Sequence, residues 1–170
     1  MGHQQSFVND DSDVVADARG GIATRSLHEH TECLAPQMYE VAAGVWSLVG
    51  NGLSNQTFIQ GPDGIIAIDT GESIEEMQSA LEYLRLVSDE PVVAVVYTHF
   101  HYVNGTAALI EKEAIQAIWG HERISHNLER SASEIAPTYS RGLIEQFGIQ
   151  MPEDGPDRVV NVGLGLAYRM

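Results

Sequence analysis

Alternating apolar and polar positions dominate the first clearly patterned part of the chain and indicate antiparallel strands. They predict one or two strands over residues 38–49, broken at Gly44, and further strands over 55–60 and 65–68. Residues 61–64 read Gly-Pro-Asp-Gly, the residue types that set the backbone angles of a tight turn. A β-hairpin is therefore expected across this turn.

A helical period replaces the alternation after this hairpin. Ser73 and Glu76 have the spacing of a capping box, and the apolar positions that follow predict an amphipathic helix over 73–88. Residues 92–97 read Val-Val-Ala-Val-Val-Tyr and are apolar on both faces, which is typical of a strand inside a covered sheet. This order of strands, helix and buried strand predicts an α/β (α+β) fold.

The pattern continues with shorter elements toward the end of the chain. It predicts a short helix over 106–113, a strand over 115–120, and helices over 122–131 and 134–148. The apolar run at 159–162 predicts the start of another strand. A sheet protein that stops where a strand begins is expected to be truncated, with neighbouring strands missing.

Residues 1–36 differ from the rest because they are polar and acidic and lack sustained apolar periodicity. They are predicted to form a flexible acidic N-terminal arm, or a strap over the packed domain, which is expected over 37–170. The first residues show neither the basic nor the apolar segment of a secretory signal, so the expected location is cytoplasmic.

Charge and cysteine content narrow the function classes. The 170 residues include 24 acidic and 9 basic residues, and the formal net charge is −15. Such acidity disfavours partners recognised through phosphate groups, so neither nucleic acid nor an anionic membrane surface is expected. Cys33 is the single cysteine, which excludes an intrachain disulfide and a zinc cluster made of cysteines.

The strongest candidate chemistry follows the apolar strand at 92–97. His99 and His101 are one residue apart, so in extended backbone their imidazoles point roughly the same way and can share one metal ion. Ligands of open α/β sheets bind at the carboxyl ends of strands. Asp69 ends the preceding strand and would lie near the histidines if the two strands are parallel neighbours. On the pattern alone, a metal site and structural or surface histidines both remain open.

The succession of motifs resembles the metallo-β-lactamase superfamily, and in its details the alkylsulfatase branch. The resemblance covers about residues 38–130. It rests on the Leu-Ser-Asn-Gln-Thr-Phe-Ile strand at 53–59, the Gly-x-x-Gly turn, the Asp-Thr-Gly ending at 69–71 and the run from Val92 to His101. The resemblance implies the N-terminal half of a metallo-β-lactamase-type αβ/βα sandwich.

The same resemblance implies a chemistry and a set of ligands. The family hydrolyses its substrates with a metal-bound hydroxide and holds one or two ions, usually zinc. The implied ligands of the first zinc are His99 and His101. Asp69 would hold a ligand in place without binding the metal itself. The implied substrate is a small-molecule ester or alkyl sulfate ester.

The chain departs from the family motif His-x-His-x-Asp-His at two positions. Val103 stands where the aspartate belongs and Asn104 where the third histidine belongs. Valine cannot bind a metal, and an amide oxygen is a weak zinc ligand. His121 is a further weak candidate after the predicted strand at 115–120, whereas His126 is expected to face solvent. No residue is assigned a catalytic role.

Two functions therefore remain open. The chain is either a metal-dependent hydrolase acting on alkyl sulfate esters, or a catalytically inactive half-domain that serves as a binding or assembly module. The second would bury its open sheet edge in a homo-oligomer or against a complementing second half.

Overall fold

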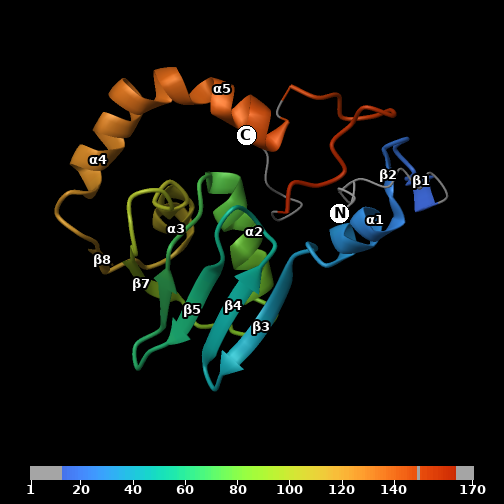
Figure 1. The fold of residues 1–170 in the computed structure, drawn as a ribbon. Helices are drawn as coiled ribbons and strands as arrows, with labels where there is room; N and C mark the ends of the chain where they lie inside the picture. Colours follow the sequence, from blue (N-terminus) through green and yellow to red (C-terminus); the bar gives the residue numbers. More distant parts are fainter. Residues whose placement is uncertain (1–12, 149, 164–170) are drawn as a thin grey trace, which may run out of the picture.

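The computed structural model describes residues 13–148 and 150–163, and a single mixed sheet forms its centre (Figure 1). The sheet has six strands whose spatial order follows the sequence. These strands are β3 (Gln37–Ala42), β4 (Val45–Val49), β5 (Gln56–Gln60), β6 (Ile65–Ile68), β7 (Val92–Val96) and β8 (Ala117–Trp119). Strands β3 to β6 pair antiparallel, and β6, β7 and β8 pair parallel.

The predicted strands and hairpin are confirmed. The segment 38–49 forms two strands, and Gly44 lies in the turn between them with φ of +70°. Strands β5 and β6 form the expected antiparallel hairpin, in which Phe58 faces Ala67. Both side chains are fully buried, so the apolar alternation marks the face of the hairpin that meets the core.

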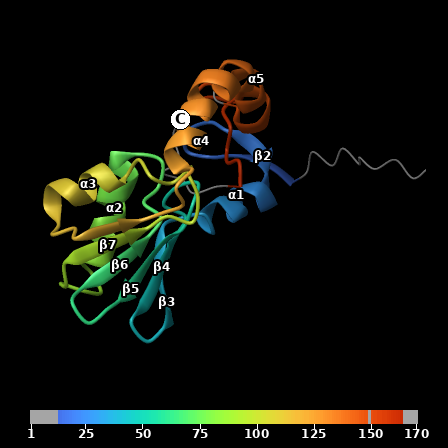
Figure 2. The same cartoon turned by 90° about the vertical axis from the view of Figure 1, so that its left-hand side faces the viewer.

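Helices α2 (Ile74–Leu84) and α3 (Thr106–Lys112) lie on the same side of the sheet (Figure 2). Helix α2 starts as predicted, because the Ser73 hydroxyl accepts a hydrogen bond from the Glu76 amide at 3.1 Å. It ends four residues before the predicted position, where the Arg85 guanidinium donates to the carbonyls of Ser88 and Glu90. The core between helices and sheet contains Leu48, Phe58, Ile65, Ala67, Met77, Ala80, Leu81, Leu84, Val92, Val95, Ala108 and Leu109.

The opposite face of the sheet is less covered than the sequence suggests. Val92 and Val95 of β7 are buried toward the helices, but Val96 on the other face is only half-buried. Its in-register neighbour Trp119 is 66% exposed. The prediction that the strand at 92–97 is buried on both faces is therefore wrong for the described residues, because α2 and α3 share one side of the sheet.

Three helical segments follow β8 and run on one after another as an arch (Figure 1). They are α4 (Ile124–Arg130), the π-helix η2 (Ser131–Ile135) and α5 (Ala136–Phe147), which confirms the predicted helices over 122–131 and 134–148. Pro137 lies in the first turn of α5, the part of a helix in which proline is found most often. Within the described residues, no helix is both long enough and apolar enough to cross a membrane.

The expected arm contains regular structure in its described part. Strands β1 (Val14–Ala16) and β2 (Ile22–Thr24) pair antiparallel and helix α1 (Arg25–Glu32) follows; we call these three elements, with the turn between the two strands, the N-terminal unit. The apolar pattern did not reveal them because the strands are three residues long and α1 has no buried residue. The division into an arm and a domain remains a prediction.

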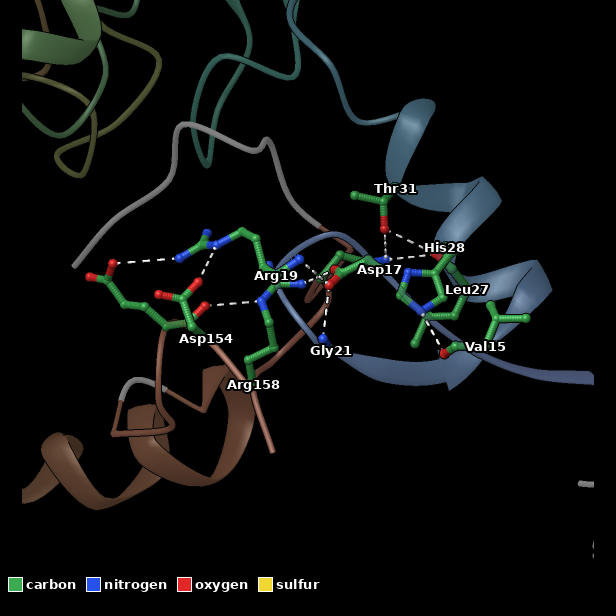
Figure 3. Close-up of polar contacts among 11 residues, drawn as sticks. Val15, Asp17, Arg19, Gly21, Leu27, His28, Thr31, Asp154 and Arg158 are labelled. Atoms are coloured by element: carbon green, nitrogen blue, oxygen red, sulfur yellow. Dashed lines mark hydrogen bonds and ion pairs between the residues drawn. The ribbon is translucent and has the colours of Figure 1, made fainter. Parts of the chain in front are cut away.

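Polar contacts join the N-terminal unit to the last described segment, residues 153–161 (Figure 3). Arg19 Nε donates to Asp154 at 2.7 Å, and Arg158 forms an ion pair with Asp17. Burial alone would raise the pKa of Asp17, but the amides of Gly21 and Arg19 and the charge of Arg158 together lower it. The two ends of the described chain are thus held side by side.

The predicted strand at 159–162 does not form. Asn161 instead donates from Nδ2 to Thr31 Oγ1 at 2.7 Å and to the Leu27 carbonyl at 3.1 Å. This segment is therefore tied to α1 rather than to a strand edge, and an apolar run without a neighbouring strand has no ladder to join.

Candidate metal site

The carboxyl ends of β6 and β7 meet at one edge of the sheet. The two strands are parallel neighbours with Ile68 opposite Val96, the arrangement that lets Asp69 approach the residues after β7. Asp69 is 8% exposed and its amide donates to the Val96 carbonyl at 2.9 Å. It has φ of +57°, a left-handed conformation that aspartate tolerates better than most residues.

Both oxygens of the Asp69 carboxylate accept hydrogen bonds from Thr98. Oδ1 accepts the Thr98 amide at 2.9 Å and Oδ2 accepts the Thr98 hydroxyl at 2.6 Å. Thr98 Oγ1 is in turn 2.8 Å from His99 Nδ1. Asp69 therefore reaches His99 through Thr98, an arrangement that suits support of a ligand better than direct ligation.

A chain of hydroxyl groups fixes the loop that carries the histidines. The amide and hydroxyl of Thr70 both donate to the Tyr102 carbonyl, at 2.9 and 3.0 Å. Thr70 Oγ1 is 3.0 Å from Thr106 Oγ1, which is 2.6 Å from the Tyr97 hydroxyl. Because the Thr70 proton goes to Tyr102, Thr106 must donate to Thr70 and Tyr97 to Thr106. Each of these three hydroxyl protons therefore has one acceptor.

Gly105 brings the end of this loop into direct contact with the segment that follows β6 and with α2. It is buried, and its amide lies 3.4 Å from the Gly71 carbonyl. A Cβ atom at this position would be 2.7 Å from Met77 Cβ and closer still to the Thr70 carbonyl oxygen. Only glycine fits here without movement of the backbone.

His99 and His101 lie side by side at the start of the loop. Their ring centroids are 5.1 Å apart and the ring planes make an angle of 71°. Two imidazoles that share a tetrahedral zinc at about 2.0–2.1 Å have centroids about 5 Å apart. Tyr102 packs edge-on against His99 at 4.7 Å, and Phe100 lies over His101 at 4.0 Å. The spacing of the pair thus fits one metal ion.

The electrostatic setting favours a cation. Partial desolvation, and then the charge of His99, lowers the pKa of the exposed His101, which favours the neutral imidazole, the form that binds a metal. Burial, and then the carboxylates of Glu72, Asp69 and Glu76, raises the pKa of Tyr102. These carboxylates create a negative potential beside the histidine pair, which attracts a cation and repels an anionic ester.

The other two candidate ligands, Asn104 and His121, each form a hydrogen bond with a backbone group. Asn104 Nδ2 donates to the Glu72 carbonyl at 3.1 Å, and His121 Nδ1 accepts the Arg123 amide at 3.1 Å. Over residues 13–148 and 150–163, no group of three or more His, Cys, Asp or Glu side chains is arranged to hold a metal. The described residues therefore fit a two-histidine part of a metal site, and the role of each residue remains a prediction.

Glu76 connects the elements around the site through hydrogen bonds that its predicted role in a helix cap did not indicate. Its Oε2 accepts the Glu72 amide at 3.0 Å and its Oε1 accepts Gln56 Nε2 at 2.5 Å. The fully buried Asn51 donates to the Glu76 carbonyl and to Gln56 Oε1. One carboxylate therefore joins β5, α2 and the loop after Asp69. A glutamine on the same face of β5 as the buried Phe58 was the signal for this network.

Replacing Glu76 with alanine is expected to lower the free energy of unfolding by about 1–3 kcal/mol, because buried donors lose their acceptor. Urea denaturation measures the change. Glu75→Ala is the matched control, since Glu75 is exposed in the same helical turn and should change stability by less than about 1 kcal/mol. Equal effects of the two substitutions would show that the Glu76 network does not stabilise the fold.

Comparisons with known proteins place these features in a family. The sequence model of the metallo-beta-lactamase superfamily matches residues 49–165. A linear primary-alkylsulfatase of Pseudomonas sp. (strain ATCC 19151) is 34% identical over 113 residues, which cover 63% of this chain and 21% of that protein. A second linear primary-alkylsulfatase, of Pseudomonas sp., is 34% identical over 138 residues, covering 76% and 20%. The chain thus spans about a fifth of the length of these curated relatives.

A solved structure shows the same fold. The stereoselective inverting sec-alkylsulfatase of Pseudomonas sp. superposes with a TM-score of 0.61 at 18% identity. The match covers 89% of this chain and 28% of that one.

Proposed function

Because the chain belongs to the metallo-beta-lactamase superfamily, we propose that it provides the first-metal histidines of a hydrolase acting on alkyl sulfate esters. The observation that carries the proposal is the His99–His101 pair at the carboxyl end of β7, at a spacing suited to one ion. A zinc ion bound there would supply Lewis acidity and a hydroxide at neutral pH.

The residues of this chain would position the ligands and hold the site together. Thr98 contacts His99 through its hydroxyl, and Tyr102 and Phe100 pack on the two imidazoles. The nearby carboxylates oppose the approach of a sulfate ester, so the negative potential must be offset by a cation before the ester binds. We therefore expect substrate binding to depend on the metal.

The similarity to alkylsulfatases supports the choice of substrate class. The sheet with helices on one side is half of a metallo-β-lactamase-type αβ/βα sandwich. The boundary of the partial domain at residue 37 fits the start of β3. Zinc, with one or two ions in the family, is the proposed cofactor.

Val103 and Asn104 favour a second candidate function. They replace the aspartate and the third histidine of the family motif, and the sheet face that carries Trp119 is open in the described structure. A catalytically inactive binding or assembly module, covering this face in a homo-oligomer or with a complementing half, would show both features.

Release of inorganic sulfate from octyl sulfate distinguishes the two functions. With zinc added, the purified chain should release sulfate, and His99→Ala and His101→Ala should reduce release to the level of the zinc-free chain. His126→Ala is the matched control, because His126 is exposed on α4. A chain that releases no sulfate in the presence of zinc would contradict the hydrolase and favour the assembly module.

A further inference from the structure

We infer that Thr98 is a positioning residue that holds neutral His99 with its proton on Nδ1 and leaves the Nε2 lone pair free for a metal. The functional meaning of this inference rests on the proposed metal role of His99. The protonation pattern itself rests on the hydrogen bonds among Asp69, Thr98 and His99.

The direction of each hydrogen bond follows from the chemistry of the three groups. The Thr98 hydroxyl gives its single proton to Asp69 Oδ2, which accepts it at 2.6 Å. The Thr98 oxygen can then only accept from its other close neighbour, His99 Nδ1, at 2.8 Å. His99 must therefore carry its proton on Nδ1, and in the neutral ring Nε2 is the nitrogen with a lone pair.

The fixed end of this relay is Asp69. It is 8% exposed, and its amide is bonded to Val96 on the neighbouring strand. Its Oδ1 also accepts the Thr98 amide, so the carboxylate and the Thr98 backbone are held together whatever the side chain at 98. Thr98 is itself exposed, but the group that orients its hydroxyl is not.

Removal of the hydroxyl isolates its effect on the imidazole. Thr98→Val keeps the shape of the side chain and the backbone bond to Asp69 but leaves His99 Nδ1 without its acceptor. The proton is then free to move to Nε2, where it blocks the nitrogen offered to the metal. Loss of a hydrogen bond that orients a metal ligand typically costs about 10–100-fold in metal affinity.

Long-range proton–nitrogen NMR of the metal-free chain reads the protonation of each imidazole nitrogen directly. The spectra are recorded about two pH units above the ordinary pKa of histidine, so that the ring is neutral. We expect the proton of His99 on Nδ1 in the natural chain and in Thr98→Ser, and mainly on Nε2 in Thr98→Val. Zinc titration by calorimetry should show about 10–100-fold weaker binding by Thr98→Val and recovery in Thr98→Ser.

Thr138→Val provides a matched threonine-to-valine control on exposed α5 and should leave both readouts unchanged. A proton on His99 Nε2 in the natural chain would overturn the inference without need of any variant. So would a Thr98→Val chain in which His99 keeps its proton on Nδ1. If the natural chain binds no zinc, the proposed function fails, while the NMR result still decides the role of Thr98.

Discussion

Replacing His99 or His101 with alanine is expected to remove zinc binding from the chain. The natural chain should bind about one zinc, because the two imidazoles have the spacing of ligands to one ion. A single remaining histidine cannot hold the ion against water. We expect each variant to lose more than about 100-fold in zinc affinity. Loss of a group that only hydrogen-bonds to a ligand already costs about 10–100-fold.

Dialysis against zinc followed by elemental analysis measures the stoichiometry, and calorimetry measures the affinity. His126→Ala and His121→Ala are controls with the same chemical change at exposed histidines, one on α4 and one bonded to the Arg123 amide. Both should bind zinc as the natural chain does. Loss of zinc on replacement of His121 would instead add that residue to the site.

The second large effect is expected at Gly105, where alanine should lower the free energy of unfolding by about 3 kcal/mol or more. The added methyl group would lie 2.7 Å from Met77 Cβ and against the Thr70 carbonyl oxygen. Because the second obstacle is backbone, relief requires the start of α3 to move away from Thr70 in the segment after β6. The same movement would disturb the loop that carries His99, so zinc affinity should fall as well.

Urea denaturation followed by tryptophan fluorescence measures this loss of stability. Gly142→Ala is the matched control in helix α5, where the nearest atom to an added Cβ is Tyr139 Cδ2 at 4.0 Å. That substitution should stabilise the chain by about 0.5–1 kcal/mol, because alanine favours a helix over glycine. If Gly105→Ala is as stable as the natural chain, the close approach of Gly105 to Thr70 and Met77 is not present in solution.

The sequence predicted those parts of the fold that local patterns determine. The hairpin of β5 and β6 follows from alternation and a Gly-Pro-Asp-Gly turn, and the start of α2 follows from Ser73. The N-terminal unit was missed because it is held by long-range polar contacts such as that between Asp17 and Arg158, 141 residues apart. Such pairs leave no periodic pattern in a sequence.

The candidate site likewise has features that local sequence patterns predict and features that depend on distant contacts. The proximity of Asp69 to the histidine pair could be predicted, because strand ends in a parallel sheet gather polar residues at one edge. Thr98 was overlooked although it directly precedes His99, since its role depends on a carboxylate 29 residues earlier. The backbone contacts of Asn104, whose partner Glu72 is 32 residues away, and of His121 could not be predicted either, because they depend on how each loop turns.

Zinc-edge X-ray absorption on the chain loaded with one equivalent of zinc tests most directly whether His99 and His101 share one ion. We predict two imidazole nitrogens at about 2.0–2.1 Å from the metal, with oxygen atoms completing the coordination. His101→Ala should retain at most one imidazole. A zinc ion surrounded by oxygen alone in the natural chain, or an imidazole count unchanged in His101→Ala, would contradict the proposed site.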